Sequence, residues 1–259
     1  MAKEILRMED VTKIYDNGFV ANKNVTFWLH ESEILALVGE NGAGKTTLMK
    51  VLFGLETPQT GKVYMDGKEV KILNTLDAIE KGIGMVHQHF MLIPSLTVAE
   101  NVVLGVEPMK NGLFDFKKAV EMTEEVAKKY NFNIDPMARV SDLSVGQMQK
   151  IEIMKVLIKG AKIIIMDEPT AVLTPQETEE LFEQLILLRN SGHSIIFISH
   201  KLEEVKRICT RVTVLRHGYC LGSYDLKDMS EADISRLMVG RDVVLKIEKE
   251  DPHSGKDCA

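Results

Sequence analysis

The sequence predicts an α/β protein built on a mostly parallel sheet, with an antiparallel β region near the N-terminus and an inserted helical subdomain. The main observation is a set of short runs rich in apolar and β-branched residues, which we predict to be strands: 34–38, 84–87, 162–166, 194–198 and 211–215. The third and fourth runs are almost wholly apolar, as expected for parallel strands covered on both faces. A helix-like segment follows each run, so right-handed strand–helix–strand crossovers are expected.

The antiparallel region is predicted from two segments that lack this strand–helix alternation. Residues 5–29 and 62–70 alternate between apolar and polar side chains. Asp66-Gly67 lies between two such alternating runs, and an Asp-Gly pair in that position is a strong hairpin signal. We therefore expect antiparallel strands before and beside the parallel core.

The helical subdomain is expected at about residues 90–160, within a single domain that spans residues 1–241. Its clearest helix is predicted over 115–130, with Val120, Val126 and Ala127 forming one modest apolar face. Residues 242–259 are charged and polar, which predicts a linker or tail.

A further helix start is predicted at Thr174. Its side chain can cap the helix, Pro175 suits the first turn, and Glu177 can complete a capping box. The buried stripe of this helix is predicted to consist of four residues, Leu181, Phe182, Leu185 and Leu188.

Composition limits the class of protein. The 259 residues are 45% hydrophobic and 27% charged, with a net charge of −6, which is ordinary for a globular protein and argues against nucleic acid as a main partner. No apolar run approaches the roughly 20 residues that cross a bilayer. Cys209, Cys220 and Cys258 match no metal or disulfide spacing, so reduced thiols are expected.

The first chemical motif is a glycine-rich loop between the 34–38 strand and an apolar helix. It reads Gly39-Glu40-Asn41-Gly42-Ala43-Gly44-Lys45-Thr46 and fits G-x-x-x-x-G-K-S/T, whose backbone N–H groups cradle nucleotide phosphates. Lys45 is expected to bridge the β- and γ-phosphates of ATP, Thr46 to bind Mg²⁺, and Thr47 to reach the α-phosphate. The alternative is a glycine-rich turn that binds nothing.

A second motif follows the 162–166 strand, where two acids end an apolar run. In α/β sheets ligands bind at the carboxyl ends of the strands. Asp167 is therefore the expected Mg²⁺ ligand, and Glu168 is placed to orient or deprotonate the attacking water. A solvated acidic turn is the alternative, although the glycine-rich loop upstream favours the catalytic interpretation.

The third motif is Leu143-Ser144-Val145-Gly146-Gln147. Ser144 is predicted to be the N-cap of the following helix, so that exposed amides and a positive dipole end point outward. The motif resembles the signature sequence of ATP-binding cassette (ABC) proteins, the ATPases that drive membrane transporters. The resemblance implies that this helix end faces the γ-phosphate held by the loop of an opposing cassette, so that catalysis needs two cassettes.

Three further residues take their expected roles from this resemblance. Tyr15 resembles the aromatic residue that stacks on adenine, although packing within the β region would also explain it. Gln88 resembles the glutamine that reaches Mg²⁺ and the water while it senses the membrane partner. His200 resembles the histidine that contacts the γ-phosphate. His87 and His89 flank Gln88 but lack the companions of a metal site.

Finer resemblance points to one subgroup of ABC proteins. Residues 85–101 and 168–177 look like those of bacterial ATPases that import simple sugars and nucleosides, usually with two cassettes in tandem. This chain resembles the first cassette, and residues 239–246 are similar to the link into a second. The resemblance implies two direct partners: a second cassette (a homodimer or a tandem domain) and integral membrane permease subunits. An extracytoplasmic solute-binding protein would be an indirect partner. The implied location is peripheral, at the cytoplasmic face of the membrane.

Two departures and two rival functions accompany this resemblance. Val145 replaces a usual glycine, and Ala171-Val172-Leu173-Thr174 replaces Ser-Ala-Leu-Asp, which puts communication between paired sites in doubt. A soluble ABC ATPase that acts on ribosomes or DNA is the main rival. The sequence lacks the sustained heptads of the DNA-acting members, and its acidic balance disfavours the ribosome-associated ones. A cassette that only binds ATP is a further alternative.

Overall fold

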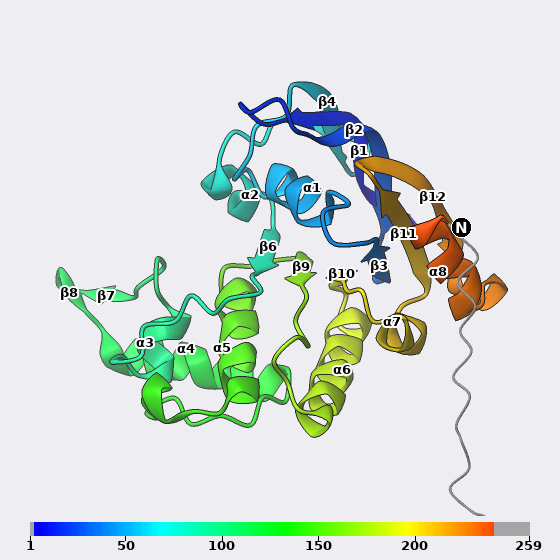
Figure 1. Ribbon diagram of the computed structural model, residues 1–259. Helices are drawn as coiled ribbons and strands as arrows, with labels where there is room; N and C mark the ends of the chain where they lie inside the picture. The colour runs from blue at the N-terminus through cyan, green and yellow to red at the C-terminus, as the bar shows by residue number, and fades with distance from the viewer. Residues whose placement is uncertain (1–2, 241–259) are drawn as a thin grey trace, which may run out of the picture.

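The computed structural model describes residues 3–240, which fold around a six-stranded sheet (Figure 1). The strand order is β12-β11-β3-β10-β9-β6, and every neighbouring pair is parallel except β11 with β12. The strands are β3 (Ile34–Val38), β6 (Ile83–Val86), β9 (Ile163–Asp167), β10 (Ser194–Ile198), β11 (Arg211–Arg216) and β12 (Tyr219–Asp225). The predicted α/β class and mostly parallel sheet are confirmed.

A four-stranded antiparallel sheet with the order β2-β1-β4-β5 forms the upper lobe in Figure 1. Its strands are β1 (Glu4–Ile14), β2 (Val20–His30), β4 (Thr60–Met65) and β5 (Lys68–Val70). Asp66 and Gly67 both have positive φ, 48° and 77°, which is the turn that a two-residue hairpin requires. Helix α1 (Lys45–Leu52) shares one hydrophobic cluster with this sheet and with the central sheet, so the two sheets sandwich the helix.

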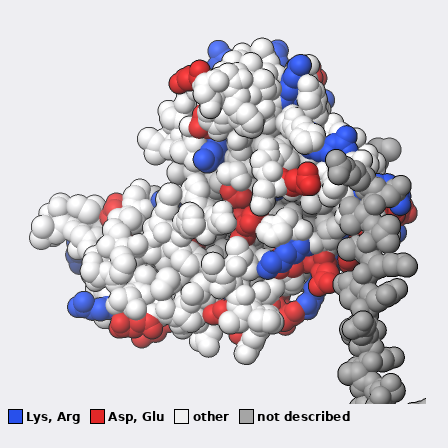
Figure 2. Space-filling view, in the orientation of Figure 1, with Lys and Arg blue, Asp and Glu red and all other residues white. Residues whose placement is uncertain are grey.

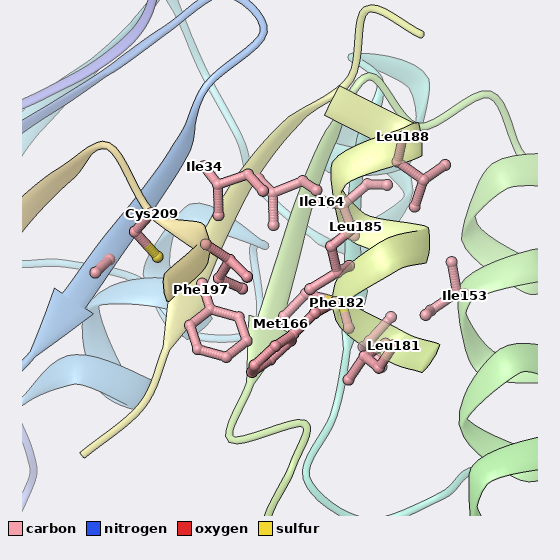
Figure 3. Close-up of a cluster of buried hydrophobic side chains, with 14 of the residues drawn as sticks. Ile34, Ile153, Ile164, Met166, Leu181, Phe182, Leu185, Leu188, Phe197 and Cys209 are labelled. Carbon is pink, nitrogen blue, oxygen red and sulfur yellow. The ribbon is translucent and has the colours of Figure 1, made fainter. Parts of the chain in front are cut away.

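The other face of the central sheet is covered by α5 (Val145–Ile158) and α6 (Pro175–Asn190). Figure 3 shows the predicted stripe on α6 directed at side chains of β9 and β10, including Ile164 and Phe197. All four stripe residues are buried. Thr174 caps α6 and forms the expected capping box with Glu177, so this helix begins where the sequence predicted.

The inserted segment contains α3 (Val98–Val102), a small hairpin of β7 (Met109–Lys110) and β8 (Leu113–Phe114), α4 (Phe116–Lys129) and a 3-10 turn (Val140–Asp142). The sequence did not predict the hairpin. The buried face of α4 agrees with the expected one only in part. Ala127 is buried as expected, but the other buried residues are Ala119 and Thr123, while Val120 and Val126 are half-buried. Small residues let α4 pack closely on α3 and α5, and the Thr123 hydroxyl donates to the Ala119 carbonyl at 2.8 Å.

The remaining elements are α2 (Thr75–Glu80), α7 (Leu202–Ile208), a second 3-10 turn (Leu226–Asp228) and α8 (Glu231–Val239). Cys209 and Cys220 are unpaired, and burial raises the pKa of both thiols. Cys258, the predicted domain end at Arg241 and the predicted tail at 242–259 lie outside the described residues. Within residues 3–240, no helix combines the length and apolar character that crossing a bilayer requires.

Candidate functional site

The glycine-rich loop connects β3 to α1, as predicted. Gly44 immediately precedes α1 with φ 97°, and a Cβ there would lie 2.3 Å from the Ala21 carbonyl oxygen. A Cβ on Gly39 would lie 2.3 Å from the Leu215 carbonyl oxygen. These close approaches need glycine, and they leave the loop wrapped around the first turn of α1, where exposed N–H groups favour an anion.

Lys45 lies inside this loop. Its side chain is buried, and its Nζ donates to the carbonyl oxygens of Gly39 at 2.8 Å and Glu40 at 3.0 Å. Burial lowers the pKa of Lys45, while the nearby carboxylates of Glu168 and Asp167 act in the opposite direction. A buried cation bonded to neutral carbonyls is poorly compensated, so an anionic ligand at this loop would stabilise it.

Asp167 ends the buried strand β9 and lies beside the loop. Thr46 Oγ1 donates to Asp167 Oδ1 at 3.3 Å. Burial raises the pKa of Asp167, and the hydrogen bond from Thr46 opposes that effect. A hydroxyl and a carboxylate oxygen fit Mg²⁺, which takes one or two protein ligands together with phosphate oxygens and waters. No group of three or more His, Cys, Asp or Glu suited to a metal occurs between residues 3 and 240, so nothing described there resembles an all-protein metal cage.

Glu168 follows Asp167 with a left-handed backbone, φ 48°, which is unfavourable for a Glu residue. Its N–H donates to the Ile198 carbonyl at the end of β10, at 3.0 Å. Its Oε1 lies 3.3 Å from Nδ1 of His200, which follows the same strand. The tight bend after β9 therefore brings the predicted base and the predicted histidine together, although they are 32 residues apart in sequence.

A cavity of about 350 Å³ is lined by most of the glycine-rich loop together with Gln88 and Glu168. Its lining comprises Phe19, Ala21, Asn41, Gly42, Ala43, Gly44, Lys45, Thr46, Thr47, Gln88 and Glu168. Gln88 is exposed just after β6, and it lines this cavity although it lies more than 40 residues from the glycine-rich loop in sequence. The cavity therefore combines a phosphate cradle, a lysine and a carboxylate.

Tyr15 is half-buried directly after β1, at the margin of this cavity. Its hydroxyl lies 3.3 Å from Thr47 Oγ1, and its ring stacks on Phe19 with centroids 6.5 Å apart. Lys13 Nζ lies 5.2 Å from the same ring. Tyr15 thus touches both the loop helix and the neighbouring aromatic residue. Phe19 lines the cavity directly, but the sequence interpretation missed it. A second aromatic residue four positions after Tyr15 was the signal in the sequence that could have indicated it.

Asn22 is a second residue that the sequence interpretation missed. It is fully buried on β2, and its Nδ2 donates to the Gly44 carbonyl at 3.1 Å. This bond ties the antiparallel sheet to the start of α1. In the sequence, Asn22 could be noticed only as a polar residue among the apolar positions of a predicted strand. Its partner could not be predicted from local pattern, because Gly44 lies 22 residues away.

The signature residues form a separate site at the start of α5. Ser144 is the N-cap, and with Gln147 it forms a capping box: Gln147 N donates to Ser144 Oγ at 3.3 Å and Ser144 N donates to Gln147 Oε1 at 2.9 Å. Val145 is exposed and Gly146 is buried. Ser144, Gly146 and Gln147 border a cavity of about 670 Å³ between α5 and α6, which shares no lining residue with the loop cavity. Within one chain, the signature and the glycine-rich loop are therefore not brought together.

Known proteins resemble this chain along most of its described length. A glucose import ATP-binding protein of Haloferax volcanii is 45% identical over 273 residues, which cover 95% of this chain and 50% of that protein. A nucleoside import ATP-binding protein of Lactococcus lactis is 46% identical over 250 residues, covering 96% of this chain and 49% of that protein. The chain spans about half the length of these curated relatives.

The fold and the sequence profile point to the same family. The solved dimeric structure of a bacterial ABC transporter cassette matches with a TM-score of 0.73 and 27% identity, covering 87% of this chain and 100% of that one. The profile of the ABC transporter family matches residues 22–171, which is more than half of the sequence. The chain therefore belongs to the ABC transporter family.

Proposed function

We propose that this chain is the ATP-binding and ATP-hydrolysing part of an importer for simple sugars or nucleosides. The observation that carries the proposal is the convergence of Lys45, Thr46 and Glu168 on one cavity, with Asp167 hydrogen-bonded to Thr46, while the signature residues border a different cavity. A site divided in this way would be completed by a second cassette, supplied by another copy or by a tandem domain. The import names of the relatives support the choice of solutes.

The chemistry follows from the positions of the side chains. The loop amides and Lys45 would bind the phosphates, with adenine near Tyr15 and Phe19. Thr46, Asp167 and Gln88 would hold Mg²⁺, which neutralises charge on the phosphate oxygens when bound. Glu168 would accept a proton from the attacking water while His200 holds its carboxylate in place. Ser144, Val145, Gly146 and Gln147 would close the site from the opposing cassette.

Replacing Glu168 by Gln tests this assignment. The variant should bind ATP as the parent does, because the loop is unchanged, and it should hydrolyse ATP at least about 100-fold more slowly. It should also accumulate as an ATP-dependent dimer in analytical ultracentrifugation. Lys45→Ala is the companion variant and should lose ATP binding. Parental turnover by Glu168→Gln would exclude Glu168 as the base.

The permease is proposed to dock on the segment that follows Gln88. Met91 and Ile93 expose 62% and 39% of their surface, although the backbone N–H of each donates a hydrogen bond to a side chain. Glu152 Oε1 accepts from Met91 N at 2.6 Å, and Lys155 Nζ donates to the Met91 carbonyl at 2.8 Å. Because Glu152 and Lys155 lie on α5, a partner bound at Met91 would be mechanically linked to the signature helix.

A matched pair of variants tests the docking surface. Met91→Ser should reduce copurification of the chain with its membrane permease, while ATP affinity and thermal stability stay at parental values. Met137→Ser is the control, because Met137 is 56% exposed but lies away from Gln88 in sequence and does not line the cavity beside Met91. Equal losses from both variants, or unfolding of Met91→Ser, would rule out this surface.

The alternative of a DNA-acting ABC ATPase has little support. The longest helix within residues 3–240 is α6, with 16 residues, so the described chain carries no long coiled-coil arm. On the face in Figure 2, described Lys and Arg side chains are scattered among acidic ones rather than gathered into one basic surface. Phosphate backbones would require such a surface. We place the protein at the cytoplasmic side of a membrane, bound through its permease.

A further inference from the structure

The start of the signature helix is already bonded to an anion of its own chain. Glu177 Oε1 accepts a hydrogen bond from Gly146 N at 2.9 Å and another from Ser144 Oγ at 3.2 Å. The other carboxylate oxygen, Oε2, accepts from the backbone N and the Oγ1 of Thr174, both at 3.0 Å. One carboxylate therefore joins the N-terminus of α5 to the N-terminus of α6.

The capping role of Glu177 on α6 does not require the contact with α5. A capping box at Thr174 uses only one acceptor oxygen, and Oε2 supplies it. The second oxygen spans 31 residues of sequence to reach Gly146. Gly146 is shaped for this approach, because a Cβ there would lie 2.6 Å from Oε1.

The charge of Glu177 remains available to repel another anion. Hydrogen bonds from Thr174 are the largest cause that lowers the pKa of Glu177, with Gly146 and Ser144 adding to it, so the side chain is ionised near neutral pH. Among the described residues that line the adjoining cavity, the single cation is Lys150, and its Nζ is bound to Glu180 at 2.7 Å. The carboxylate of Glu177 is thus held by four hydrogen-bond donors and two helix N-termini, with no described cation of this cavity paired to it.

We propose that Glu177 occupies the phosphate-binding donors of the signature helix in the unpaired cassette and must leave them when a second cassette presents its nucleotide. This inference rests on the proposed function, in which Ser144 and Gly146 receive a γ-phosphate. Each of these donors carries one hydrogen, so it cannot fully serve a carboxylate and a phosphate together. The two anions would also repel each other at hydrogen-bonding distance. Glu177 therefore opposes premature pairing of cassettes.

A purely structural brace would act in the opposite direction. If Glu177 only held Ser144 and Gly146 in their productive positions, removing its charge would loosen α5 and weaken pairing. If it competes with the nucleotide, removing its charge frees the donors and strengthens pairing. The direction of the change in ATP-dependent dimerisation therefore separates the two roles.

The test uses the Glu168→Gln background, in which bound ATP is not consumed. The measured quantity is the ATP concentration at which half of the protein sediments as a dimer, with Mg²⁺ present. Adding Glu177→Gln should lower that concentration about threefold to tenfold, because an exposed charge-assisted contact is replaced by a weaker neutral one. Gln can still complete the capping box on α6, so the fold should persist. Glu177→Ala should shift the concentration in the same direction.

Thr174→Ala is the matched control. It removes the cap hydroxyl of α6 but leaves the Glu177 carboxylate facing Gly146, so it should lower thermal stability without favouring the dimer. An unchanged or higher half-dimer concentration for both Glu177 variants would overturn the inference while leaving the proposed function intact. A Glu168→Gln background that binds ATP and stays monomeric would overturn both.

Discussion

Replacing Asp167 by Asn should stabilise the nucleotide-free protein and abolish the extra stability that Mg²⁺ adds to the ATP-bound form. Asp167 is only 5% exposed, and burial raises the pKa of its carboxyl group. The hydrogen bond that it accepts from Thr46 is 3.3 Å long, against about 2.7 Å for a typical O–H···O bond. Lys45 directs its hydrogen bonds to carbonyl oxygens of the loop instead. The free protein therefore holds a poorly compensated buried charge.

The size of the effect follows from what Asn preserves. Asn has nearly the same shape and can accept the same bond from Thr46, so the main change is loss of the charge. Single stabilising substitutions commonly add about 0.5–2 kcal/mol of stability. We expect about 1 kcal/mol, because attraction to Lys45 already offsets part of the penalty. For a domain of this size, that corresponds to a rise of about 2–4 °C in Tm.

Thermal unfolding of the free, ATP-bound and Mg²⁺–ATP-bound proteins measures both effects. Asp167→Asn should raise the Tm of the free protein and show the same Tm with ATP whether or not Mg²⁺ is present. The exposed Asp228 provides a control, because Asp228→Asn should leave all three values unchanged. This reasoning would be contradicted by a lower Tm for nucleotide-free Asp167→Asn. It would also be contradicted if adding Mg²⁺ to the ATP-bound variant raised its Tm as much as it raises that of the parent.

Three further outcomes are expected. In urea titrations, the stability gain from Asp167→Asn should grow between about pH 4 and pH 7. Above the usual Asp pKa, the native parent binds more protons than its unfolded chain, because burial raises the pKa of Asp167. The parent therefore loses stability as the pH rises, while the Asn variant does not. Phe197→Ala should lower the free energy of unfolding by about 3–5 kcal/mol, since Phe197 is fully buried with its ring centroid 6.2 Å from that of Phe182. Gly39→Ala should lower the free energy of unfolding by about 1–3 kcal/mol, because the new Cβ collides with the Leu215 carbonyl. If calorimetry shows a smaller decrease in that free energy, the loop can move aside.

The elements that the sequence predicted are those set by local patterns. The β-branched runs became β3, β6, β9, β10 and β11, because such runs are stable only when both faces are covered. The Asp66-Gly67 turn and the Thr174 capping box each depend on a few neighbouring residues. The nearness of Asp167 to Thr46 also followed from topology, since the glycine-rich loop and the acids lie at the carboxyl ends of strands in one parallel sheet.

The features that the sequence did not predict depend on contacts between distant segments. Glu177 bonds to Gly146, and Lys155 bonds to the Met91 carbonyl across 64 residues. No local pattern encodes either distance. The buried face of α4 was predicted only in part: Ala127 is buried as expected, but apolar character also suggested the two valines, whereas close helix packing selects small residues such as Ala119. Tertiary packing therefore decides the details that connect the two halves of the site.

The central claim is that each catalytic site is shared between two cassettes, and mixing two inactive variants tests it directly. Lys45→Ala removes the loop lysine, and Ser144→Arg blocks the signature helix; each alone should hydrolyse no ATP. In an equal mixture about half of the dimers would be mixed, each with one intact shared site, so about a quarter of parental activity should return. Failure to recover activity, when an affinity tag on one variant captures the other and so shows that mixed dimers form, would contradict the shared site.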